Sequence, residues 1–217
     1  MNTFLICGNA FRDLCDVVFD TREKIENNNT NLNSVGKLWF VKGDLLELFQ
    51  NKILNNLLVP ITLISLNADE NITYDKYRRL IESPMILRWF AQNCGVVHSK
   101  VIPIPIGIAN PEYPHGNQAQ LLSERFAVYH QNRSHRLRKS LIYINFSDGT
   151  HSSRFFVRDY FRHWDPTKPE FGPFQCAFQE TPVNFVDYLR QMSECQFVAS
   201  PQGNGYDCHR TWEAIYM

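Results

Sequence analysis

The sequence lacks the features that mark several common classes of protein. Its charge is balanced, with 22 basic and 22 acidic side chains in 217 residues, so it has no positive excess for binding nucleic acid. Its six cysteines form no Cys-x-x-Cys pair, which argues against a zinc site or a disulfide framework. No stretch approaches the ~20 apolar residues of a membrane span, and the N-terminus lacks the basic segment of a signal peptide. We therefore predict a cytoplasmic protein with no membrane segment and no bound metal.

What the sequence does contain is an alternation of short apolar runs and helical patterns. The runs are continuous, as expected for parallel strands covered on both faces, and lie at residues 3–7, 37–42, 61–66, 100–108, 140–146 and 196–200. Helices are predicted at 45–57 with Asp44 as the cap, at 74–83, at 85–93, from about 118, and at 182–195 with Thr181 as the cap. This pattern predicts an α/β fold.

Breaks in the pattern suggest two domains. The Asn-rich stretch 26–33 is predicted to be a surface loop, and residues 132–139 interrupt the helical and apolar patterns. We place the boundary there, which gives an N-terminal α/β domain over 1–137 and a C-terminal α/β domain over 138–217.

The last 22 residues, QFVASPQGNGYDCHRTWEAIYM, predict a strand at 196–200, a glycine turn and a helix capped by Asp207. The N-terminus of a helix beside the carboxyl end of a strand attracts anions. Arg210 and Glu213 are three positions apart and share a helical face, so an arginine suited to a diphosphate lies one turn from a carboxylate suited to ribose hydroxyls. A surface ion pair is the alternative for these two residues.

The stretch FVASPQGNGYDCHRTWEAIYM (residues 197–217) resembles the nucleotide-sugar site of exostosin-like glycosyltransferases. Three further blocks, at 63–72, 89–116 and 141–154, are similar to other segments of that family and occur in the same order. The resemblance implies a GT-B architecture of two Rossmann-like halves, the first on the acceptor side and the second binding the donor. It also implies metal-independent transfer of a sugar from a nucleoside diphosphate sugar to an acceptor hydroxyl. The absence of Asp-x-Asp, the metal motif of the other main glycosyltransferase fold, agrees with this.

The resemblance assigns roles to residues of the closing segment. Arg210 would neutralise the departing diphosphate, and Glu213 would hold the ribose. The phosphate turn would be lined by Gly203, Asn204 and Gly205, whose backbone N–H groups would bind the phosphates.

Other candidates come from the ends of predicted strands. Asn145 and Ser147 would face the donor. Arg154 would either contact a phosphate or be an exposed arginine on a helix whose N-cap is Ser152. On the acceptor side, Asn67 and Asp69 either meet the acceptor or cap a helix. His115 is either a general base or a turn histidine bonded to the backbone. His209 and Cys208 are adjacent and point apart on a helix, so we reject a metal site there.

The family pattern continues beyond the position of Met217, so we expect an incomplete donor domain. The expected function is a glycosyltransferase or a fragment of one. The alternative from another class is a non-catalytic remnant that binds a glycan or a nucleotide. A nicotinamide-dependent dehydrogenase is disfavoured, because residues 7–13, CGNAFRD, do not supply the Gly-x-Gly-x-x-Gly motif.

Overall fold

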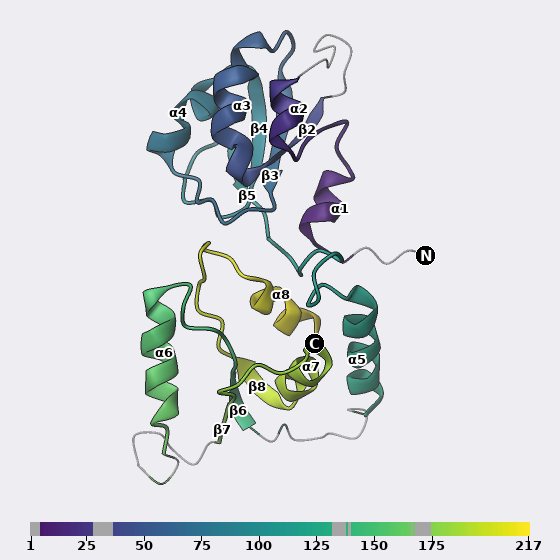
Figure 1. Cartoon of the computed structure of the whole chain (residues 1–217), viewed down its shortest axis with the longest axis vertical. Helices are drawn as coiled ribbons and strands as arrows, with labels where there is room; N and C mark the ends of the chain where they lie inside the picture. The colour runs from purple at the N-terminus through teal and green to yellow at the C-terminus, as the bar shows by residue number, and fades with distance from the viewer. Residues whose placement is uncertain (1–4, 28–36, 132–137, 139, 166, 168–174) are drawn as a thin grey trace. The chain divides into compact units, whose positions relative to one another are not determined.

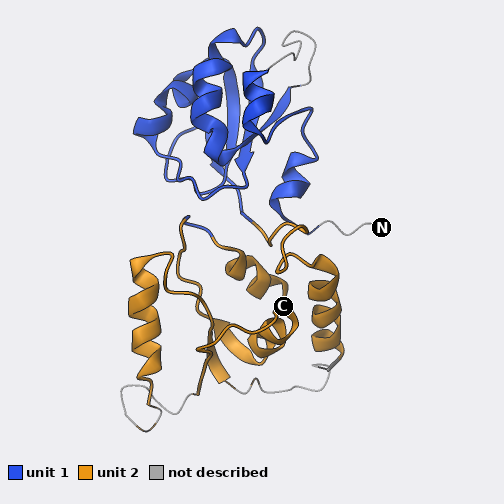
Figure 2. Ribbon diagram, viewed as in Figure 1, with its two compact units in different colours: residues 1–106, 205–207 blue, residues 107–204, 208–217 orange. Residues whose placement is uncertain are grey.

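The computed structural model describes residues 5–27, 37–131, 138, 140–165, 167 and 175–217. These residues form two compact units (Figure 2): residues 1–106 with 205–207 make unit 1, and residues 107–204 with 208–217 make unit 2. The chain passes between units after residue 106, upstream of the boundary predicted at 137/138, which adjoins residues outside the described ones. The predicted loop at 26–33 also lies largely outside them.

Unit 1 is built on a five-stranded parallel sheet (Figure 1) whose strands follow each other in chain order. The strands are β1 (Val17–Phe19), β2 (Leu38–Lys42), β3 (Ile61–Leu66), β4 (Ile86–Ala91) and β5 (Val101–Pro103). Because right-handed crossovers that always step the same way bring their helices to one face, the connecting helices are expected side by side. Helices α2 (Arg22–Glu26), α3 (Leu46–Lys52) and α4 (Tyr74–Glu82) pack in that manner.

The main core of unit 1 lies between these helices and the sheet. Trp39 and Trp89 are fully buried there, and Trp89 packs edge-on against Tyr77 of α4 at 5.7 Å between ring centroids. Trp89 Nε1 donates to Ser65 Oγ at 2.8 Å, so the buried indole donor is satisfied inside the sheet. On the other face, Phe40 and Ile64 are covered in part by Phe11 of α1 (Gly8–Arg12).

Two local predictions in unit 1 are wrong, and a third is only partly covered by the described residues. Residues 85–93 form strand β4 and not a helix, because pairing with β3 and β5 overrides a pattern that also fits helical spacing. Asp44 lies in the short 3₁₀ turn Gly43–Leu45 and pairs with Lys42, while Leu45 caps α3. Residues 3 and 4 of the first predicted strand lie outside the described residues, and helix α1 begins directly after Cys7.

Unit 2 contains a three-stranded parallel sheet in the order β7, β6, β8. Strand β6 (Ser140–Ile144) is central, with β7 (Cys176–Phe178) on one side and β8 (Cys195–Val198) on the other. The chain therefore reverses direction across the sheet after β7. That reversal puts α6 (Ser152–Arg162) and α7 (Phe185–Ser193) on opposite sides of it (Figure 1). Helices α5 (Gln118–Gln131) and α8 (His209–Tyr216) complete the unit, and both pack against α7.

The predicted caps in unit 2 also need correction. Asn184 caps α7 by accepting the N–H of Asp187 at 2.9 Å, so the helix begins after Thr181 and Pro182. His151, not Ser152, caps α6, and Cys208, not Asp207, precedes α8. Both sheets are parallel, so the α/β class is confirmed. In the described part of the chain, no helix is long and apolar enough to cross a membrane.

Candidate functional site

Unit 2 holds a pocket of about 1110 Å³ at the carboxyl end of its sheet. Open parallel sheets bind ligands at this end, at the point where the strand order reverses, and here that point lies between β6 and β8. The walls come from the segments that follow β6 and β7, from one face of α6, and from the start of α8. The lining residues that carry the argument are Asn145, Ser147, Arg154, Arg158, Arg162, His115, Tyr188, His209, Arg210 and Glu213.

Arg210 reaches the pocket from the first turn of α8. Its Nε donates to the backbone oxygen of Asn145 at 3.0 Å, and its guanidinium lies 5.3 Å from the centroid of the Phe146 ring. Nη1 is buried and has no hydrogen-bond partner among the described residues. A buried cationic donor without an acceptor is costly, so this N–H group is placed to donate to an anionic ligand.

Glu213 lies one turn further along α8 and is 4% exposed. Its Oε2 accepts the hydroxyl of Tyr188 at 2.8 Å. Burial raises the pKa of the Glu213 carboxyl above its usual value, although the Tyr188 hydrogen bond and the charge of Arg210 both oppose that rise. Burial and the Glu213 charge also raise the pKa of Tyr188. The pair places a carboxylate acceptor in the pocket wall.

Arg154 is 7% exposed, so it is not the exposed helical arginine that was one of its two predicted roles. Its Nε donates to the backbone oxygen of Gln202 at 2.8 Å, its Nη1 to that of Ser147 at 3.1 Å, and its Nη2 to that of Pro201 at 3.4 Å. Burial, and then repulsion from Arg210, lower its pKa. Arg154 therefore ties the segment after β6 to the turn after β8.

Two arginines that the sequence analysis did not name extend this row along α6. Arg158 donates to the backbone oxygens of Phe146 and Glu180 at 2.6 and 2.8 Å, and Arg162 Nε lies 3.3 Å from Glu180 Oε1. Arg154, Arg158 and Arg162 are spaced four apart, which places them on one helical face. That spacing was a usable signal in the sequence, and the row makes this side of the pocket positively charged.

Two histidines line another part of the pocket. His115 stacks on Tyr113 at 5.8 Å between centroids, and its ring lies 6.2 Å from that of His209. His209 Nδ1 is 2.8 Å from the backbone oxygen of Gly107. Both His115 and His209 therefore line the pocket.

The predicted phosphate turn is divided between the units. Gly203 belongs to unit 2, where a Cβ would meet Arg154 Nη2 at 2.8 Å, and the exposed Asn204 follows it. Gly205 belongs to unit 1, where a Cβ would approach Asn93 Nδ2 to 2.3 Å. Asp207 is fixed in unit 1 as well: its N–H donates to Asn93 Oδ1, and its Oδ2 accepts the N–H of Ile106 at 2.8 Å. Gly203 and Gly205 thus each allow a close approach that a side chain would obstruct.

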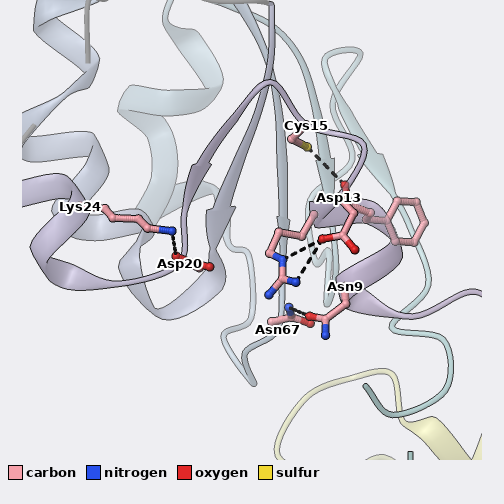
Figure 3. Close-up of polar contacts among 8 residues, drawn as sticks. Asn9, Asp13, Cys15, Asp20, Lys24 and Asn67 are labelled. Atoms are coloured by element: carbon pink, nitrogen blue, oxygen red, sulfur yellow. Dashed lines mark hydrogen bonds and ion pairs between the residues drawn. The ribbon is translucent and has the colours of Figure 1, made fainter. Parts of the chain in front are cut away.

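Asn67 and Asp69 lie in a smaller hollow of about 600 Å³ in unit 1, after β3. Asn67 has a positive φ of 61°, and its side-chain nitrogen is 3.5 Å from Asn9 Oδ1 (Figure 3). Its backbone N–H donates to Gln92 Oε1 at 3.1 Å. Lys42, Asp44 and Glu70 share the hollow, so it is a polar surface of mixed charge.

The unit 2 pocket combines a row of guanidinium groups, a helix N-terminus and a buried carboxylate. These groups suit a ligand with an anionic part and a hydroxyl-bearing part. No group of three or more His, Cys, Asp or Glu residues placed to hold a metal ion occurs in the described residues.

Two comparisons with known proteins find no relative of the chain. A scan against family models finds no match to the chain, and a search of curated proteins finds none either.

Proposed function

We propose that the pocket of unit 2 binds a nucleoside diphosphate sugar and that the protein is a glycosyltransferase, or part of one. The sugar passes to an acceptor hydroxyl, and protein cations rather than a metal ion stabilise the leaving diphosphate. In the GT-B arrangement that the resemblance implies, unit 2 corresponds to the donor-binding half and unit 1 to the acceptor-binding half.

The observation that carries the proposal is the state of Arg210. Its Nη1 is buried in the pocket without a partner among the described residues, at the N-terminus of α8 and beside the switch point of the sheet. A diphosphate supplies the missing acceptor, and the helix N-terminus favours its charge. Glu213, one turn deeper, accepts the Tyr188 hydroxyl in the described chain, and its carboxylate would likewise accept ribose hydroxyls.

A turnover assay tests the proposal. The purified chain is incubated with UDP- and GDP-sugars, with and without hydroxyl acceptors, and release of the free nucleoside diphosphate is measured. Arg210→Met removes the guanidinium and keeps an apolar side chain of similar length. Arg190→Met is the matched control, because Arg190 is an exposed arginine of unit 2 that pairs with Glu124 outside the pocket.

We expect release by the wild type and by Arg190→Met, and a loss of about 10²-fold or more in Arg210→Met, which is typical for removal of one stabilising donor. Nucleotide binding without release would leave the non-catalytic binding protein as the function. Equal release by Arg210→Met and wild type would contradict the assigned role of Arg210.

A further inference from the structure

The proposed reaction needs a group that takes the proton of the acceptor hydroxyl. The pocket is lined by arginines, by Tyr188 and Cys208, and by five further titratable side chains. These five are His115, Asp148, Glu180, His209 and Glu213. Glu213 already accepts the Tyr188 hydroxyl, and Glu180 is paired with Arg162. Asp148 is exposed in the loop after β6. The two histidines remain, and one of them has a defined tautomer.

The hydrogen bond to Gly107 fixes the state of the His209 ring. A carbonyl oxygen only accepts, so Nδ1 carries the proton in the 2.8 Å contact. The neutral ring then has its lone pair on Nε2, which is the state required of a base. Gly107 has a positive φ of 70°, a conformation that glycine adopts without strain, so the carbonyl is held by a backbone that suits it.

The position of His209 relates this base to the proposed donor site. His209 is the first residue of α8, adjacent to Arg210, and both side chains line the pocket. The charged or ionisable neighbours of His209 include Arg210 and Cys208 along the chain, and His115 at 6.2 Å between ring centroids. Because both side chains line one pocket, we expect a base at His209 to lie near the leaving group that Arg210 holds.

We propose that His209 is the catalytic base of the transfer, an inference that rests on the proposed function. The acceptor oxygen forms a bond to the anomeric carbon while the bond from that carbon to the diphosphate oxygen breaks. The electron pair leaves with the diphosphate at Arg210, and the hydroxyl proton passes to Nε2 of His209. The imidazolium is stabilised by its Nδ1–H bond to Gly107 and later loses the proton to water. This single displacement inverts the anomeric configuration.

The test compares His209→Gln with His163→Gln. Glutamine at 209 keeps a polar amide in the pocket but is not basic. His163 is the matched control, because its Nδ1 lies 2.9 Å from the Asp159 backbone oxygen on the exposed end of α6, outside the pocket. The measurements are nucleotide binding by thermal shift, the rate of transfer against pH, and the anomeric configuration of the product by NMR.

We expect His209→Gln to bind nucleotide like the wild type, to lose about 10²–10⁴-fold in kcat, and to lose the limb of the pH–rate profile that a histidine base gives between about pH 5 and 8. The control should keep both rate and limb. The assignment would be overturned by an unchanged kcat in His209→Gln, or by loss of the pH–rate limb in His115→Gln instead. A product that retains the anomeric configuration would also overturn it. A wild type that binds nucleotide without turnover also overturns it, whereas failure to bind any nucleotide contradicts the proposed function itself.

Discussion

Replacing Arg154 by Met tests whether this arginine stabilises the fold of unit 2 or contacts a phosphate of the ligand. Two of its hydrogen bonds, to the backbone oxygens of Gln202 and Ser147, are 2.8 and 3.1 Å long, and the third, to Pro201, is a weaker 3.4 Å. Hydrogen bonds to a charged group contribute about 1.5–3 kcal/mol each. Part of that gain offsets the burial of the guanidinium, which is reflected in its lowered pKa.

Two full bonds at the lower end of that range give a loss of about 3 kcal/mol in the free energy of unfolding. For a chain of this size the loss corresponds to a fall of about 6–12 °C in Tm. Arg162→Met is the control on the same helix, because its contact with Glu180 is 3.3 Å long and both side chains are largely exposed. That change should cost less than about 1 kcal/mol.

Urea denaturation and calorimetry of the ligand-free variants measure both losses. An Arg154→Met protein as stable as the wild type, but with weaker nucleotide binding, would refute this reasoning. It would make Arg154 a phosphate contact, which is the other role predicted from the sequence.

Three further outcomes are expected. Because burial raises the pKa of Glu213, its ionised form is less favourable in the folded protein than in the unfolded one. The stability of the wild type relative to that of Glu213→Gln should therefore fall as the pH rises from about 4, and a constant difference between the two from pH 4 to 8 would contradict this. Gly205→Ala should destabilise unit 1 by about 1–3 kcal/mol in urea denaturation, because a Cβ would lie 2.3–2.7 Å from the Asn93 amide. Gly149→Ala is the control and should cost far less, because the nearest neighbour of its Cβ would be 3.8 Å away. Equal losses in the two variants would show that Asn93 moves aside freely. Burial raises the pKa of Cys15 to about 12 and those of Cys176 and Cys195 to about 11. Iodoacetamide at pH 8 should therefore alkylate these three thiols much more slowly than a peptide thiol, as followed by mass spectrometry. Rapid and complete alkylation of all three would contradict their burial.

The closing strand, turn and helix could be predicted because each has a strong local signal. A continuous apolar run gives β8, and helical spacing after the glycines gives α8. Strand β4 could not be assigned in this way, since Ile86, Trp89 and Phe90 also fit one helical face, and its pairing partners are distant in sequence. Strands β1 and β7 have three residues each, too few for a period to appear.

For the candidate site too, the sequence could identify residues that lie close together along the chain, but not contacts between distant segments. Arg210 and Glu213 were found because they share one helix and one face. The contact of Tyr188 with Glu213 depends on how α7 packs on α8, and the close approach of Gly205 to Asn93 joins segments more than a hundred residues apart. Neither follows from spacing along the chain.

The most direct test of the central claim is titration calorimetry of the whole chain with UDP and GDP, for the wild type, Arg210→Met and Arg190→Met. We predict one site per chain for one of the two nucleotides. Its affinity should fall by about tenfold or more, a loss of about 1.4 kcal/mol, in Arg210→Met and not in Arg190→Met. Absence of binding to a folded wild-type chain, or equal affinity in Arg210→Met, would contradict the claim that this pocket is a nucleotide-sugar site.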